Sequence, residues 1–208
     1  MMLTRRHLFA LLLCPLLSAQ PSSPEEHFGH RMGADRAVLD WEKVVSYFRQ
    51  LEEKSPRVKF LEYGKSTEGR PMIAAVISAP ATLQNLEKYL DIQRRLADPR
   101  LTPPEEAARL AGEGKTVVLI TCSVHATEIA STHTAIELAY RLATAQDAKT
   151  LRILDNVILV LAPSINPDGL DLVTAWYRRT LGTPFEGTSP PELYQKYVGH
   201  DNNRDWDF

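Results

Sequence analysis

Apolar residues recur at helical spacing in two stretches of the chain and in strand-like runs between them. Over residues 41–51 this spacing predicts an amphipathic helix, which Asp40 could cap. Residues 57–80 contain two apolar runs joined by the turn "KSTEGR", which predicts a β-hairpin. A second amphipathic helix is predicted over 82–97, and a shorter one after "TPPEE".

Farther along, the apolar positions form continuous runs. The segments "TVVLIT" (116–121) and "NVILVLAP" (156–163) are rich in β-branched residues, which is typical of strands buried on both faces. A helix is predicted between them over 127–143. Strand, crossover helix and strand in this order predict an α/β fold with a mixed, largely parallel sheet and helices on both faces.

Unusual polar motifs follow both of these strands, where α/β sheets collect functional groups. The first, "SVHATE", carries His125 and Glu128 three residues apart, so a turn between strand and helix could bring both to one zinc ion. The alternative is structural: His125 would end a strand, and Glu128 would favour the first turn of a helix.

The second motif, "INPDG", predicts a sharp chain reversal. After it come "WYRRT" and, at the end of the sequence, "HDNNRDWDF". Arginines on loops beside a metal suit an anionic substrate, because one guanidinium can grip a carboxylate while another stabilises an oxyanion. The alternative is that Arg178, Arg179 and Arg204 are solvated surface groups.

The first nineteen residues have the layout of a secretory signal peptide. Arg5 and Arg6 precede a short apolar run, and Ser18 and Ala19 offer a cleavage site. The run is too short for a stable membrane span, and "TRRHLF" resembles a twin-arginine signal. We therefore expect an exported protein, periplasmic or extracellular, with lipidation at Cys14 as a minor alternative.

Without residues 1–19 the chain has 22 basic and 26 acidic residues, a net charge of −4. No basic cluster indicates a nucleic-acid partner. Cys122 is then the remaining cysteine, so no disulfide within the chain is expected. Residues 20–39 have the composition of a polar leader, and residues 40–208 are long enough for one domain.

Taken in order, "YGKSTEGRP", "HATE", "NPDG", "YRRT" and "DNNRDW" resemble the zinc carboxypeptidases, the carboxypeptidase A-like metallopeptidases. The likeness runs from about Trp41 to the last residue. It implies that His125 and Glu128 are the first two zinc ligands and that Arg178 polarises the scissile carbonyl. Thr127 stands where some members carry an arginine, so one substrate contact would be missing.

The same resemblance assigns roles in the last motif. Asn203 and Arg204 would hold the terminal carboxylate of a peptide substrate, and Asp201 would orient the first zinc histidine. A third ligand and a catalytic glutamate should come later in a zinc carboxypeptidase. We therefore expect this chain to be the amino-terminal part of a longer enzyme and inactive by itself.

Other interpretations remain open at this point. Zinc-dependent deacylases and cell-wall peptide amidases of similar fold would use the same two ligands, and a non-catalytic binding domain could retain the pocket. Cys122 is expected to be a buried strand residue, and His133 a structural one. His200 could line the pocket and is a minor alternative as a zinc ligand.

Overall fold

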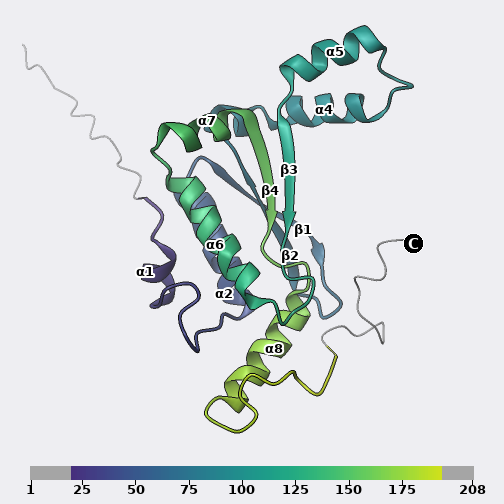
Figure 1. Ribbon diagram of the computed structural model, residues 1–208. Helices are drawn as coiled ribbons and strands as arrows, with labels where there is room; N and C mark the ends of the chain where they lie inside the picture. Colours follow the sequence, from purple (N-terminus) through teal and green to yellow (C-terminus); the bar gives the residue numbers. More distant parts are fainter. Residues whose placement is uncertain (1–19, 194–208) are drawn as a thin grey trace, which may run out of the picture.

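The structure is a computed structural model that describes residues 20–193 (Figure 1). The described helices are α1 (Pro24–Phe28), α2 (Trp41–Lys54), α3 (Pro80–Gln84), α4 (Leu86–Ala97), α5 (Pro104–Glu113), α6 (Ile129–Thr144), α7 (Ala148–Asn156) and α8 (Pro167–Thr180). The strands are β1 (Val58–Lys65), β2 (Pro71–Ile77), β3 (Thr116–Thr121) and β4 (Val157–Ala162). The predicted α/β class is confirmed, and each helix and strand that the sequence analysis predicted has a counterpart among these elements. The predicted signal peptide lies outside the described residues.

The sheet has the strand order β1-β2-β4-β3. The pairs β1/β2 and β2/β4 are antiparallel, and β3/β4 is parallel, with α6 as the crossover helix. A mixed sheet is thus confirmed. In the described part of the chain, the expected parallel arrangement applies only to β3 and β4, because the hairpin adds its two strands in the opposite sense.

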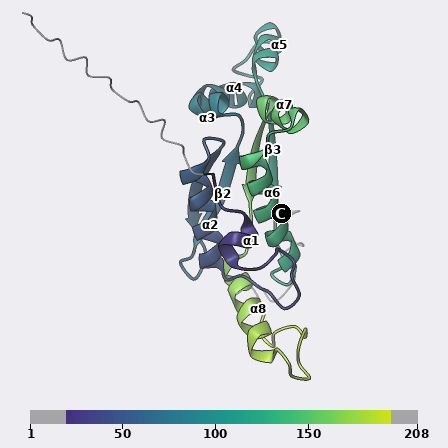
Figure 2. The same cartoon turned by 90° about the vertical axis from the view of Figure 1, so that its left-hand side faces the viewer.

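Helices α2 and α6 lie side by side and cover one face of the sheet (Figures 1 and 2). Side chains alternate along each strand, so every second residue faces these helices. Ile73 and Ile77 on β2 and Leu161 on β4 are fully buried there, against Phe48 and Leu51 of α2. This layer is the hydrophobic core of the described residues.

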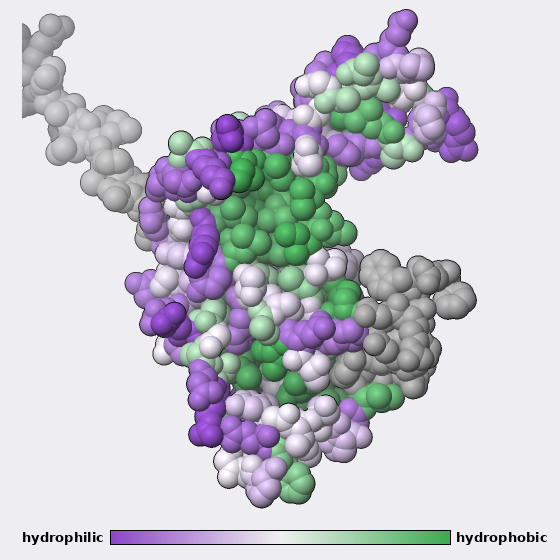
Figure 3. Space-filling model, in the orientation of Figure 1, coloured by the Kyte–Doolittle hydropathy of each residue, from purple (hydrophilic) through white to green (hydrophobic). Residues whose placement is uncertain are grey.

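The opposite face of the sheet carries a broad apolar surface (Figure 3). Leu61, Val117 and Leu119 are exposed on it, and Leu119 is 66% exposed. Helix α4 meets this face at one end, and a groove of about 290 Å³ lies between them. The prediction that β3 is buried on both faces is therefore wrong for the described residues, because β3 is an edge strand there and no described helix covers its outer side.

The polar segment 20–39 packs onto the core rather than standing apart from it. Its helix α1 begins with a capping box formed by Ser23 and Glu26. The ring of Phe28 lies 5.2 Å from that of Tyr47, whose hydroxyl donates to the carbonyl of Ser22 at 3.0 Å. Sequence polarity in this segment thus reflects its outer surface and not a lack of structure.

None of the helices within residues 20–193 is long and apolar enough to cross a membrane.

Candidate metal site

The motif "SVHATE" forms the elbow between β3 and α6. Cys122 extends the pairing of β3, because its N–H donates to the carbonyl of Ala162 at 3.0 Å. The chain then turns at Ser123, whose φ of 52° lies in the left-handed region. Helix α6 begins six residues later at Ile129. The predicted elbow is therefore present, at the carboxyl end of the parallel strand.

The elbow brings His125 and Glu128 together. The imidazole Nδ1 lies 3.0 Å from the carboxylate Oε1, and the N–H of Glu128 donates to the carbonyl of His125 at 3.0 Å, which closes the turn. The side chain of His125 is 20% exposed and that of Glu128 is 56% exposed. Both donor groups are thus within reach of solvent and of an ion.

The spacing of the two groups fits a zinc ion. Zinc–nitrogen and zinc–oxygen bonds of about 2.1 Å at a tetrahedral angle place the two donor atoms about 3.4 Å apart. The observed 3.0 Å between Nδ1 and Oε1 is a hydrogen bond, so an ion that both atoms bind would replace the shared proton and move them apart by a few tenths of an ångström. In residues 20–193 no group of three or more His, Cys, Asp and Glu side chains surrounds a possible metal position. Within the described residues, His125 and Glu128 are thus the two side chains that could hold an ion at this elbow.

The second motif, "NPDG", starts helix α8 directly after β4. Asn166 is the N-cap and its Oδ1 accepts the N–H of Gly169 at 3.0 Å, while Pro167 occupies the first helical turn. The Asn166 amide also donates to the carbonyl of Val124 at 3.4 Å. The start of α8 is thus tied to the backbone immediately before His125.

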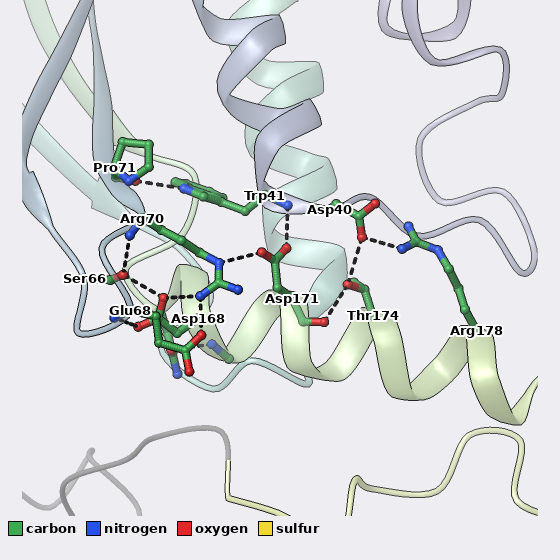
Figure 4. A network of polar contacts seen from close by, with 12 residues as sticks. Asp40, Trp41, Ser66, Glu68, Arg70, Pro71, Asp168, Asp171, Thr174 and Arg178 are labelled. Atoms are coloured by element: carbon green, nitrogen blue, oxygen red, sulfur yellow. Dashed lines mark hydrogen bonds and ion pairs between the residues drawn. The ribbon is translucent and has the colours of Figure 1, made fainter.

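Arg178 and Arg179 were expected on a loop. The structure places both in the last turn of helix α8 instead. Arg178 forms an ion pair with Asp40 (Figure 4). It also donates to the carbonyl of Val38 at 3.0 Å. Helical rise puts it about 18 Å along the axis from Asn166. The structure therefore does not bring Arg178 to His125 and Glu128, and its role at the metal stays a prediction.

The remaining predicted site residues, Asp201, Asn203 and Arg204, lie outside the described residues, as does His200. Thr127 is exposed on the elbow. Cys122 is half-buried, and burial raises the pKa of its thiol, which disfavours the thiolate needed for metal binding or nucleophilic attack.

A polar network between the β1–β2 turn, α2 and α8 was not anticipated from the sequence (Figure 4). Arg70, at the end of the β1–β2 turn, donates to Asp171 at 2.6 Å and to Asp168 at 2.8 Å, and it also pairs with Glu68. Asp171 in turn accepts the N–H of Trp41 at 2.7 Å. Burial alone would lower the pKa of Arg70, but these carboxylates raise it above its usual value.

The network joins three elements far apart in the sequence: the hairpin turn, α2 and α8. It thereby fixes α8, whose first residues contact the elbow. In the sequence, the acidic partners Asp168 and Asp171 come about a hundred positions after Arg70. That separation conceals the contact from any local pattern.

His133 on α6 is buried, and its Nδ1 accepts the N–H of Gly33 at 3.2 Å. Nδ1 must therefore be unprotonated, and the other nitrogen, Nε2, is buried without a hydrogen-bond partner. Burial and the nearby His30 lower the pKa of His133. The structural role expected for this residue agrees with these contacts.

We expect His133 to make the domain less stable in mild acid. Because its folded-state pKa lies below the ordinary value of 6.5, the unfolded chain binds the extra proton first. The free energy of unfolding should therefore fall as the pH drops below that value, by at most about 1.4 kcal/mol per pH unit from this group. Urea unfolding at about pH 7.5 and 5.5 measures the effect, and His133→Gln, which can still accept from Gly33, should reduce it. An equal fall in the free energy of unfolding for the unmodified chain and for His133→Gln would show that His133 does not cause the acid sensitivity.

Comparisons with known proteins add the family. The profile described as zinc carboxypeptidase matches residues 44–208. The structure is similar to carboxypeptidase A from Helicoverpa armigera (18% identity, TM-score 0.47), covering 76% of this chain and 32% of that protein. It is also similar to thrombin-activatable fibrinolysis inhibitor (15% identity, TM-score 0.49), covering 73% and 34%.

A metallo-carboxypeptidase from Burkholderia cenocepacia is 22% identical, with a TM-score of 0.42, over 63% of this chain and 28% of that protein. The chain thus spans about a third of the length of these proteins. The search of curated proteins finds no match. On the profile match, which extends over most of its residues, the chain belongs to the zinc carboxypeptidase family.

Proposed function

We propose that this chain carries the first two zinc ligands of a zinc metallocarboxypeptidase that removes carboxy-terminal residues from peptides. One observation carries the proposal: in a member of the zinc carboxypeptidase family, His125 Nδ1 and Glu128 Oε1 stand 3.0 Å apart on a strand-to-helix elbow.

His125 and Glu128 would hold the zinc ion, and their donor types, one imidazole and one carboxylate, match zinc's preferences. When bound, zinc supplies a Lewis acid for a carbonyl oxygen and lowers the pKa of a water molecule. The chain's own residues would do the rest of the positioning. In the proposal, Asp201 orients His125, and Asn203 and Arg204 hold the substrate's terminal carboxylate, as the family resemblance implies.

Arg178 enters the proposal as the group that polarises the scissile carbonyl. Its guanidinium is held by Asp40 in the described structure, and its side chain is 42% exposed. An exposed ion pair of this kind is weak, so it would release Arg178 at little cost. For that residue to reach the metal pair, the last turns of α8 would also have to change course.

The proposed enzyme acts after export, since residues 1–19 have the layout of a signal peptide. Its partner is a peptide with a free carboxy terminus.

The test uses matched peptides with a free or an amidated carboxy terminus, incubated with the complete polypeptide that contains this chain. We expect zinc-dependent release of the last residue from the free peptide only. Equal cleavage of both peptides, or preferential hydrolysis of N-acyl amino acids, would favour the deacylase or amidase class. Zinc binding without hydrolysis of any substrate would favour a non-catalytic binding domain.

A further inference from the structure

Ser123 has an unusual backbone conformation for a residue with a side chain. Its φ of 52° is one of two positive values at non-glycine positions in the described residues. Residues other than glycine adopt a positive φ at a cost in free energy. Residues strained in this way concentrate at functional sites. Ser123 is also only 2% exposed and stands two residues before His125. Something in its surroundings must therefore hold it there.

The hydroxyl groups of Ser123, Ser131 and Thr132 form one cluster. The Ser123 Oγ lies 2.9 Å from Ser131 Oγ and 2.9 Å from Thr132 Oγ1. Thr132 Oγ1 donates to the carbonyl of Pro163 at 2.8 Å, just after β4. Each hydroxyl thus has a defined partner, and the cluster joins the elbow to α6 and to the neighbouring strand end.

The cluster also holds both ends of the elbow. At the first end, the N–H of Ser123 donates to Ser131 Oγ at 3.1 Å. At the other end, the carbonyl of Glu128 accepts from Ser131 Oγ at 2.7 Å and from Ser123 Oγ at 3.2 Å. His125 lies between these two fixed points.

We infer that Ser123 is a positioning residue for the metal pair: through this hydroxyl cluster it sets the distance between His125 and Glu128 that zinc requires. The inference rests on the proposed function and adds a residue that touches neither the ion nor the substrate. Chelate sites gain affinity from ligands that are already in place, and loss of the groups that orient ligands typically weakens metal binding about 10–100-fold.

A purely structural role is the competing explanation, because buried polar groups need partners in any protein. Two substitutions separate the explanations. Ser123→Ala removes the central hydroxyl, yet Ser131 and Thr132 keep the carbonyls of Glu128 and Pro163 as acceptors. Ser123→Gly removes the same hydroxyl and also relieves the positive φ. Stability should therefore differ between the two variants, whereas a positioning role requires both to lose zinc affinity.

The experiment is a zinc titration of the chain, followed by NMR of the histidine ring nitrogens, with the His125 signal assigned by its loss in His125→Gln. We expect the zinc dissociation constant to rise about tenfold in both Ser123 variants. Thr134→Ala is the matched control, since this hydroxyl donates to the carbonyl of Ala130 on the same helix but outside the cluster. Its zinc affinity should equal that of the unmodified chain.

Each outcome has one meaning. If zinc leaves the His125 signal of the unmodified chain unchanged, the proposed function fails. If zinc shifts that signal with equal affinity in the unmodified chain and in both variants, the inference about Ser123 fails. Lower stability of the variants without a change in zinc affinity has the same meaning, because it shows a purely structural role. Should Ser123→Ala and Ser123→Gly both fail to fold, Ser131→Ala takes their place with the same expected loss, because Ser131 binds both ends of the elbow.

Discussion

Replacement of His125 by alanine should abolish specific zinc binding by this chain. In the proposed site His125 is one of two ligands within the described residues, so its loss leaves a single carboxylate. We expect affinity to fall by at least about a hundredfold, because one exposed carboxylate cannot retain zinc against water. Competition with a fluorescent zinc indicator measures the change.

Two variants control this experiment. Glu128→Gln keeps the shape of the second ligand but removes its charge, so it should also lose most of the affinity. His27→Ala removes an exposed histidine on α1 and should leave zinc binding as it is. Unchanged affinity in His125→Ala would show that zinc, if bound at all, is held elsewhere on the chain.

Replacement of Arg70 by alanine should cause a large loss of stability. Its guanidinium, 29% exposed, is the cation shared by Glu68, Asp168 and Asp171 (Figure 4). Without it, three carboxylates would face one another in a partly desolvated site. We expect the free energy of unfolding to fall by about 2–3 kcal/mol, somewhat less than for a fully buried pair. Urea unfolding at neutral pH measures this loss.

Arg178→Ala is the matched comparison, since Arg178 also pairs with a carboxylate but is 42% exposed. Exposed ion pairs contribute about 0–1 kcal/mol, so this variant should lose at most that amount. Arg70→Lys should fall between the two, because lysine keeps the charge but lacks the fork that reaches two carboxylates. Similar losses for Arg70→Ala and Arg178→Ala would show that the network does not hold the elements together.

Periodicity predicted most of the elements correctly, because burial against one core face leaves a strong pattern. The amphipathic helix α2 and the hairpin of β1 and β2 are where the pattern placed them. The predicted helix over 82–97 is divided at Asn85 into α3 and α4. Exposure was harder to predict: the apolar content of "TVVLIT" indicated a strand, but not that Leu119 would lie on an uncovered face.

The closeness of His125 and Glu128 was predicted from local sequence, since three residues and one turn determine it, while their binding of a metal stays a prediction. The course of the chain after "NPDG" was not predicted. These residues were interpreted as a reversal, although Asn166 followed by Pro167 is also the usual start of a helix. The contacts of Arg70 with Asp168 and Asp171 join residues about a hundred positions apart, so no local pattern could indicate them. The partners of Ser123 lie within nine residues of it, but the apolar and polar pattern of the elbow does not distinguish these hydroxyls from exposed ones.

The proposed function depends on His125 and Glu128 binding one zinc ion together. Crystals of the chain soaked with zinc, with diffraction recorded on both sides of the zinc absorption edge, test it most directly. We expect an anomalous peak within about 2.2 Å of both His125 Nδ1 and a carboxylate oxygen of Glu128. A peak bound to other residues, with these two side chains turned apart, would contradict it.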